Sequence, residues 1–230
     1  QLSTVTDGTN TIASYDYIGV RRKQVEFENG ATASYSYTGF RSEVERIHHE
    51  TSTPATILDL QYGYDDNHDR VYERYGGSSS SGDAFEYDWA RRLTVAWMGS
   101  ADVTAPSSSA YTNKVEYTMD DDGNRSTVKL TPYGQSATTT SYTDNSLNQY
   151  TAVGGATYTH DKNGNLKDDG SQAYEYDYKN QIVRIKQSST TIAEYKYDAL
   201  GRRVEKDDQT NVERYIYSGD ETVAMYDGSN

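Results

Sequence analysis

The chain contains no cysteine, which excludes disulfide bonds and thiolate metal sites. It also has no uninterrupted apolar run of the length that a membrane-spanning helix needs, about 18 residues. The first residues, Gln-Leu-Ser-Thr-Val, lack the basic end and apolar stretch of a signal peptide, so we expect any export signal to be removed or to lie upstream. Sustained helical spacing of apolar residues is nearly absent as well. Helical and disulfide-linked fold classes are therefore disfavoured.

The usual core residues are scarce, whereas tyrosine is abundant. Hydrophobic residues make up 34% of the chain, and they include 23 Tyr but only three Phe and two Trp. Tyrosine must therefore supply much of the buried surface, and each buried hydroxyl then needs a hydrogen-bond partner. This composition favours a thin, partly hydrated sheet over a thick, dry core.

The charge balance is acidic, with 35 Asp and Glu against 22 Lys and Arg and a formal net charge of −13. Nucleic acid is not an expected partner, because phosphate binding requires clustered Lys and Arg. Anionic membrane surfaces are disfavoured for the same reason. An acidic surface of this kind suits solubility at high concentration or outside a cell.

A short unit recurs along the whole chain. The clearest copy, residues 195–204, reads YKYDALGRRV, and residues 174–185 (YEYDYKNQIVRI) and 85–95 (FEYDWARRLTV) are similar. Copies begin at residues 15, 35, 62, 85, 115, 142, 158, 174, 195 and 215. Because the unit is constant and its spacing varies, we expect one repeat region over residues 1–230, with about ten units and no separate domain.

Each unit predicts a two-stranded antiparallel hairpin. Tyr-x-Tyr places two rings on one face of a strand, Asp starts a turn, Gly supplies a positive φ, and Arg with Val begins the return strand. About twenty strands would form, and a sheet that wide should coil, so we predict an all-β, antiparallel hairpin repeat array forming a spiral or barrel-like shell segment. The motif residues of the best copies are Tyr195, Tyr197, Asp198, Gly201 and Arg202, then Tyr174, Tyr176 and Asp177, then Tyr87, Asp88 and Arg91.

The motif also predicts ion pairs that hold the turns. We expect Asp198 to pair with Arg202, and Asp88 to pair with Arg91 or Arg92. Two segments, residues 76–82 and 101–112, are rich in Gly, Ser or Pro and are predicted to be extended excursions from the strip.

Candidate binding residues are few. Trp89 and Trp97 lie in one region and are candidates for stacking on a ligand, while the motif tyrosines are better explained as structural ladders. The acidic turns at residues 120–124 and 161–165 do not match a calcium loop, and hairpin turns need the same residue types. His48 and His49 would point to opposite faces of a strand. We therefore expect no metal and no cofactor.

No catalytic site is indicated either. The paired carboxylates lie in turns, and the sequence contains no nucleophile elbow, zinc-protease motif or phosphate-binding loop. We expect that the chain is not an enzyme.

These units resemble the YD repeats of the RHS family, whose motif is YDxxGRL. Residues 197–206 (YDALGRRVEK) are a near-complete match, residues 176–185 lack the Gly and the Arg, and the copy at residue 85 has Ala90 where the Gly is expected. The resemblance covers essentially the whole chain. Residues 215–230 are similar to the stretch that directly precedes the RHS-associated core, which carries self-cleaving aspartates in toxin-bearing members. That activity is not assigned to this chain.

The resemblance implies a long β-sheet spiralling into a hollow shell that encloses a C-terminal toxin or binds carbohydrate at a cell surface. We thus expect a structural β-shell segment of a secreted or cell-surface bacterial protein that encloses or presents a C-terminal effector. The alternatives are a carbohydrate- or cell-surface-binding adhesin module and a subunit of an extracellular filament. The expected partners are the rest of the parent chain (RHS core and effector), a glycan or cell-surface partner, and further copies joined through open strand edges.

Overall fold

The structure is a computed structural model that describes residues 1–39, 42–76 and 80–228. The last residues of the repeat copy that begins at residue 35, Phe40 and Arg41, lie outside the described residues, as does the 77–79 part of the first predicted excursion.

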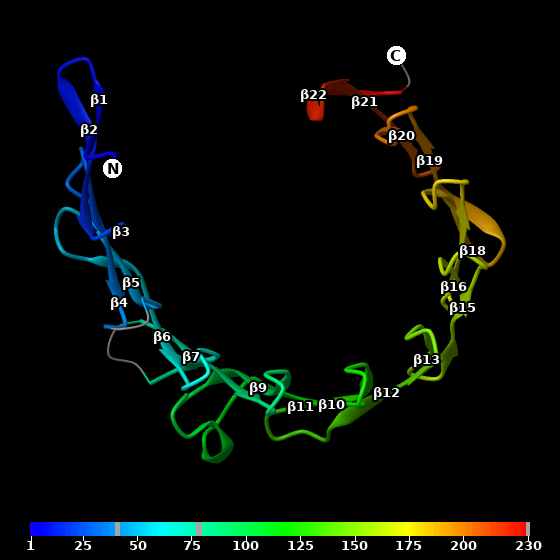
Figure 1. The fold of residues 1–230 in the computed structure, drawn as a ribbon, viewed down its shortest axis with the longest axis horizontal. Coiled ribbons are helices and arrows are strands. Elements are labelled where there is room, and N and C mark those ends of the chain that lie inside the picture. Colours follow the sequence, from blue (N-terminus) through cyan, green and yellow to red (C-terminus); the bar gives the residue numbers. More distant parts are fainter. Residues whose placement is uncertain (40–41, 77–79, 229–230) are drawn as a thin grey trace. The chain divides into compact units, whose positions relative to one another are not determined.

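The described residues form antiparallel strands that are hydrogen-bonded in the order of the sequence (Figure 1). The first sheet contains β1 (Thr4–Asp7), β2 (Asn10–Ile18), β3 (Arg21–Phe27), β4 (Thr32–Tyr37), β5 (Val44–Glu50), β6 (Thr56–Tyr64), β7 (Arg70–Tyr75), β8 (Gly82–Tyr87), β9 (Leu93–Ser100), β10 (Asn113–Met119), β11 (Arg125–Pro132), β12 (Thr138–Asp144), β13 (Tyr150–Val153) and β14 (Ala156–Thr157). The second contains β15 (Thr159–His160), β16 (Leu166–Asp168), β17 (Gln172–Tyr176), β18 (Ile182–Gln187), β19 (Thr190–Tyr197), β20 (Arg203–Asp207), β21 (Val212–Ser218) and β22 (Glu221–Asp227). Helix in the described ranges is limited to the 3-10 turn η1 (Pro106–Ser108).

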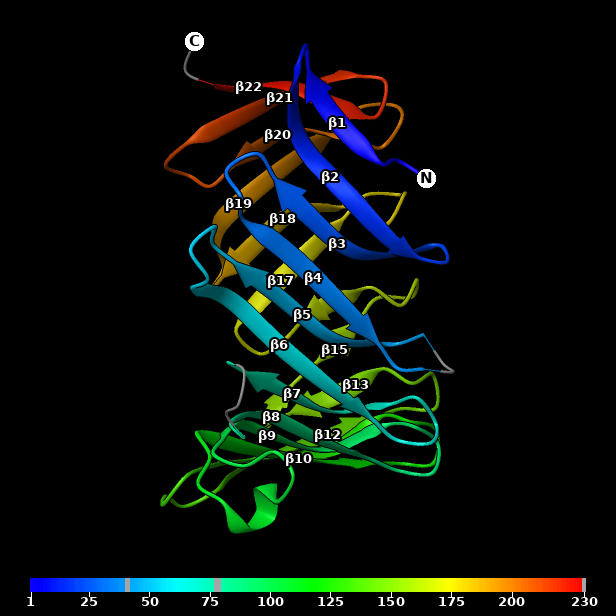
Figure 2. The ribbon, with the colours of Figure 1, turned by 90° about the vertical axis from the view of Figure 1, so that its left-hand side faces the viewer.

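The chain divides into two compact units. Unit 1 comprises residues 1–118 and 128–138, and unit 2 comprises residues 119–127 and 139–230. In unit 1, β2 to β6 lie side by side in chain order, with their turns alternating between the two rims of the sheet (Figure 2). Strands β15 to β22 of unit 2 follow the same order. In each unit we call the rim formed by the turns after the Tyr-x-Tyr strands the motif rim.

The repeat interpretation is confirmed at the level of strands. Nine of the ten residues at which a copy begins lie inside a strand, while Tyr158 lies between β14 and β15. The prediction of about twenty strands compares with 22 strands in the described residues, β1 to β22. The chain is therefore an all-β, antiparallel hairpin array.

The motif turns at Asp88, Asp177 and Asp198 share one backbone geometry. The strand register shifts by one residue at each of them, between Glu86 and Tyr87, between Glu175 and Tyr176 and between Lys196 and Tyr197. The third residue after the motif Asp has a positive φ, +87° at Gly201, +62° at Asn180 and +63° at Arg91. Such a bulge allows a three-residue loop to follow the twist of the two strands.

This geometry corrects our alignment of the copy at residue 85. The glycine position is Arg91, which adopts the left-handed φ, and not Ala90. The motif arginine of that copy is therefore Arg92. Arginine at a left-handed position is tolerated at a modest cost in backbone strain, so the missing glycine does not abolish the turn.

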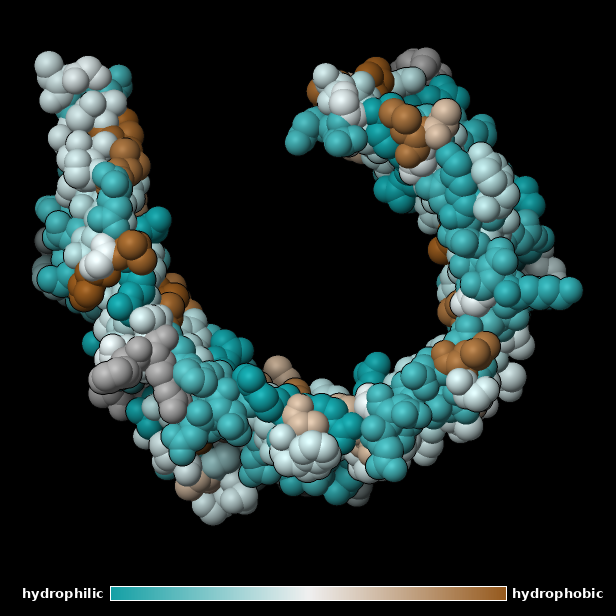
Figure 3. Space-filling model, viewed as in Figure 1, coloured by the Kyte–Doolittle hydropathy of each residue, from teal (hydrophilic) through white to brown (hydrophobic). Residues whose placement is uncertain are grey.

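The core is thin, as the composition predicted, but its fully buried side chains are mostly Ala and Val, and tyrosines such as Tyr15 and Tyr35 pack against it half-buried. The buried hydrophobic side chains are Ala13, Val25, Ala33, Ala84, Ala96, Trp97, Val103 and Ala193. Hydrophilic residues cover most of the visible surface of each unit, with scattered hydrophobic patches (Figure 3). No helix among the described residues is long and apolar enough to cross a membrane.

The second predicted excursion, residues 101–112, packs back onto unit 1. Val103 is only 4% exposed and lies in one cluster with Ala84 and Trp97, while its backbone N–H donates to the carbonyl of Ser80 at 2.9 Å. The expectation of an extended excursion is wrong for this loop, because its single valine covers a tryptophan that would otherwise be exposed.

Candidate functional site

The motif Asp closes its own turn. Asp198 Oδ1 accepts hydrogen bonds from the backbone N–H groups of Leu200 and Arg202, both at 2.9 Å. These bonds are the Asx-type contacts that favour Asp at the start of a turn. The backbone N–H of Arg202 and, after it, the Arg202 guanidinium lower the pKa of the Asp198 carboxyl. The same pair of backbone bonds forms at Asp65, Asp88, Asn145, Asp161 and Asp177.

The predicted ion pairs have definite partners. Arg202 Nη2 lies 2.6 Å from Asp198 Oδ2. Asp88 pairs with Arg92, whose Nε lies 2.7 Å from Asp88 Oδ2, while Arg91 reaches the neighbouring turn and binds Asp69 at 2.8 Å. Our prediction left open whether Arg91 or Arg92 pairs with Asp88. In the structure Arg92 pairs with Asp88 within its own turn, and Arg91 links that turn to its neighbour.

Long side chains at the fourth position after the motif Asp form forward links to the next turn. In unit 2, Gln181 Nε2 donates to the carbonyl of Gly201 at 2.8 Å, and Arg202 Nη1 donates to the carbonyl of Gly219. Gln149 makes the corresponding bond to the carbonyl of Gly164 at 3.4 Å. Hydrogen bonds therefore connect successive turns along the motif rim of unit 2.

The second tyrosine of the motif forms a backward link. Tyr197 donates its hydroxyl to the carbonyl of Ile182 at 2.9 Å, across to the return strand of the preceding hairpin. Burial raises the pKa of the Tyr197 phenol. The other tyrosines with this link, at 2.7 to 2.9 Å, are Tyr17, Tyr37, Tyr64, Tyr87, Tyr176 and Tyr217. The motif tyrosine thus satisfies its hydroxyl and couples two hairpins with the same bond.

The first tyrosine of the motif takes part in ring–guanidinium stacks. Arg203 lies 5.6 Å from the ring centre of Tyr195, in its own hairpin, and 5.3 Å from that of Tyr215, in the next. Two sets in unit 1 repeat this arrangement, with Arg22 between Tyr15 and Tyr35 and with Arg70 between Tyr62 and Phe85. Such contacts stabilise by about 0.5–1 kcal/mol at exposed sites.

The opposite face of the sheet carries ladders of opposite charge. Arg184 bridges Glu175 at 2.8 Å and Glu194 at 2.7 Å, across three adjacent strands of unit 2. Glu205 is likewise held between Lys196 and Arg214. Alternation of side chains along a strand puts these residues behind the tyrosines. Both faces therefore bind neighbouring strands together.

The two candidate tryptophans differ in exposure. Trp89 is 93% exposed at the motif rim of unit 1, whereas Trp97 is 3% exposed and packs against Ala84 and Val103. Trp97 is therefore removed from the candidates for ligand stacking, because no ligand can reach its ring.

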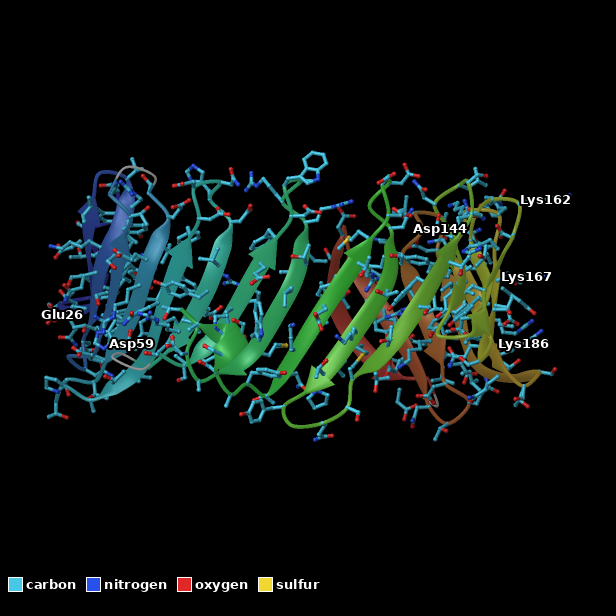
Figure 4. The ribbon with its side chains drawn as sticks, turned by 90° about the horizontal axis from the view of Figure 1, so that it is seen from below. Glu26, Asp59, Asp144, Lys162, Lys167 and Lys186 are labelled. Carbon is cyan, nitrogen blue, oxygen red and sulfur yellow. The ribbon has the colours of Figure 1, made fainter. Side chains whose placement is uncertain are left out.

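The acidic turns use their oxygens locally. Asp120 and Asp161 each accept hydrogen bonds from the backbone and the side-chain amide of the asparagine four residues later. Hydrogen bonds from those turns lower the pKa of both carboxyls. Within the described ranges, no group of three or more His, Cys, Asp or Glu side chains is placed to hold a metal ion. Figure 4 shows Asp144 and Lys162 toward the motif rim of unit 2 and Lys186 toward its other rim.

Sequence reasoning missed two features of this site. It placed Arg203 only at the start of a return strand and assigned no role to Gln181, although the first lies in the ring stacks and the second forms a forward link. The available signal was the residue type, because Gln149, Gln181 and Arg202 are all long hydrogen-bond donors at one motif position.

The fold and these contacts define a class of protein, a structural array of coupled β-hairpins. A family model, Teneurin YD-shell, matches residues 55–225, and the chain belongs to this family of YD-shell proteins. This agrees with the resemblance to YD and RHS repeats.

Known proteins add two kinds of likeness. The chain is 36% identical over 115 residues to the tRNA3(Ser)-specific nuclease WapA of Bacillus spizizenii and to the tRNA nuclease WapA of Bacillus subtilis, covering 49% of this chain and 5% of each relative. It matches the Photorhabdus luminescens Tc holotoxin pore with a TM-score of 0.70 at 17% identity, over 96% of this chain and 12% of the other. The TcdB2–TccC3 crystal structure matches with a TM-score of 0.63 at 16% identity, over 93% and 12%. The chain thus shares the fold of a small part of much longer proteins.

Proposed function

We propose that this chain is a wall segment of a secreted or cell-surface protein and that the wall encloses or presents a C-terminal effector. The observation that carries the proposal is the coupling of motif copies to their neighbours, which the copy at residue 195 shows in both directions. Tyr197 reaches back to Ile182, and Arg202 reaches forward to Gly219. A chain that commits its rings, guanidinium groups and turn carboxylates to these contacts builds a continuous barrier.

Relatives support the effector part of the proposal. Two similar proteins are named as tRNA nucleases, and the matched structures include a toxin pore. The chain covers only 5% of the former and 12% of the latter. We infer that the wall segment accompanies an activity carried elsewhere in such a protein and has no catalytic role itself.

The repeat pattern supports treating residues 1–230 as one repeat region. Motif turns of the same geometry occur in both compact units, at Asp88 in unit 1 and at Asp161, Asp177 and Asp198 in unit 2. We therefore propose that the two units are parts of one array and not separate domains.

Protease protection of the effector in the parent protein tests the function. The triple variant Tyr176→Phe, Tyr197→Phe, Gln181→Ala removes two backward links and one forward link from neighbouring hairpins. We expect the effector to become cleavable in this variant and to stay protected in the control Tyr178→Phe, whose ring is 87% exposed. If hydrogen exchange shows that the triple variant has a loosened wall, and the effector is still as well protected as in the control, enclosure is rejected.

A second candidate function, carbohydrate binding, rests on Trp89. Its ring is almost fully exposed at the motif rim, where an aromatic face can stack on a sugar. A glycan array with the chain and its Trp89→Ala variant tests this function, with Val20→Ala, at an 88% exposed turn residue, as control. Sugar binding that is lost only in Trp89→Ala would favour an adhesin.

A further inference from the structure

Two pairs of tyrosine rings are in direct contact in the part of the chain that the structure describes. The ring centres of Tyr111 and Tyr133 lie 5.2 Å apart at an interplanar angle of 78°, and those of Tyr142 and Tyr150 lie 5.2 Å apart at 54°. Both distances are typical of contacting aromatic rings. Tyr111 and Tyr133 lie outside the motif copies, so the backward links and ring–guanidinium stacks of the array give this pair no role.

The backbone holds the Tyr111–Tyr133 pair in place. The Tyr133 N–H donates to the Thr112 carbonyl at 3.2 Å, and the Thr112 N–H donates to the Met98 carbonyl at 2.8 Å. Tyr111 is half-buried and packs against the cluster that contains Trp97. Both tyrosines belong to unit 1. The two rings are therefore kept next to each other by contacts that do not depend on the phenol groups.

The phenol groups of this pair are available for chemistry. Tyr133 is 57% exposed, so an oxidant in solution can reach its ring. Within the described residues neither hydroxyl of the pair has a hydrogen-bond partner in the protein, whereas Tyr197 and its equivalents commit theirs to backbone carbonyls. An electron and a phenolic proton can therefore leave this pair without breaking a contact that holds the sheet.

The second pair is less suited to oxidation. The Arg125 guanidinium lies 5.1 Å from the centre of the Tyr142 ring, and the Arg125 backbone N–H donates to the Tyr150 hydroxyl at 2.9 Å. A cation beside a ring opposes the positive charge that develops when the ring loses an electron. The Tyr111–Tyr133 pair is therefore the better candidate for oxidative coupling.

We propose that Tyr111 and Tyr133 are a site of oxidative cross-linking, at which hydrogen peroxide and a haem peroxidase join the two rings as dityrosine. Each tyrosine loses one electron and its phenolic proton, and the two radicals couple through a carbon–carbon bond between ring carbons ortho to the hydroxyls. The hydrogens on those carbons then move to the phenolic oxygens and restore both rings. The chain loses two hydrogen atoms in total, and the peroxide is reduced to two water molecules.

The bond gives a chain without cysteine a covalent cross-link. It joins the end of the 101–112 loop to the segment after β11 and so fastens the loop that covers Trp97. Like a disulfide, it restricts the unfolded chain, because residues 111–133 become a closed loop. The inference is independent of the proposed wall function, since it depends only on this pair and its surroundings.

Peroxidase treatment of the whole 230-residue chain tests the proposal. Dilute protein is incubated with a haem peroxidase and hydrogen peroxide, the monomer is isolated by size exclusion, and its tryptic peptides are analysed by mass spectrometry. Trypsin places Tyr111 in residues 93–114, where it is the only tyrosine, and Tyr133 in residues 130–162. We expect these two peptides to be joined, with a mass two hydrogen atoms below their sum. A link between two tyrosines within residues 130–162 does not join the two peptides and is thereby distinguished.

Two variants remove one phenol each and keep the ring. The joined peptides should disappear in Tyr133→Phe and in Tyr111→Phe. Tyr178→Phe is the matched control, because Tyr178 is 87% exposed and takes part in neither ring pair, and the joined peptides should form in it as in the unchanged chain. Their yield per chain should stay constant on about tenfold dilution, because both rings belong to one chain. Joined peptides that persist in Tyr133→Phe, that require high protein concentration, or that never form would overturn the proposal.

Discussion

Replacing Tyr197 with phenylalanine isolates one backward link. Phenylalanine keeps the ring and removes only the hydroxyl that donates to the Ile182 carbonyl at 2.9 Å. A hydrogen bond of this kind contributes about 0.5–1.5 kcal/mol net, because water competes for both partners in the unfolded chain. For a chain of this length, a loss of 1 kcal/mol lowers the melting temperature by about 2–4 °C.

Thermal unfolding followed by far-UV circular dichroism measures the effect. Tyr178→Phe is the control, because that tyrosine is 87% exposed at a turn and should not change the melting temperature. The double variant Tyr176→Phe, Tyr197→Phe removes two consecutive links and should approach the sum of the single losses. If Tyr197→Phe melts with the Tyr178→Phe control, the backward link does not couple the hairpins and the reasoning fails.

Three further outcomes are expected. Trp97→Ala should destabilise by about 3–5 kcal/mol in urea titrations, because it empties a buried site, whereas Trp89→Ala should stay within about 0.5 kcal/mol. Gly201→Val should cost about 1–2 kcal/mol or more by the same titration, since φ is +87° there, and Gly201→Asn should cost much less. Stability should fall as pH rises above about 10. Partial burial raises the pKa of Tyr174 to about 12 and also raises the pKa values of Tyr62 and Tyr64, so the unfolded chain loses these protons first. Urea midpoints between pH 8 and 11.5 that do not fall would contradict this.

The strands and turns could be predicted because their causes are local. Tyrosine alternation specifies a strand face, and Asp at the turn meets backbone N–H groups only two and four residues away. Such contacts lie within one motif copy, so a single copy such as residues 195–204 contains the information.

The couplings between hairpins could not be predicted in the same way. Arg203 contacts Tyr215, and Gln181 contacts Gly201, only after two neighbouring copies are in register. The burial of Trp97 depends on Val103, which arrives from a loop of irregular sequence. A tryptophan in a strand and a tryptophan in a turn look alike until that loop is placed.

The forward link explains why the motif ends in a long donor. Successive motif turns are two strands apart, about 10 Å, so a short side chain cannot reach the next carbonyl alone. Gln149, Gln181 and Arg202 span the gap by length. Where the position holds Asn124, the bond is to another side chain, Asn148 Oδ1 at 3.3 Å, and two short residues share the distance. Arg202 therefore contributes reach as well as charge, and Gln181 and Gln149 contribute reach without charge.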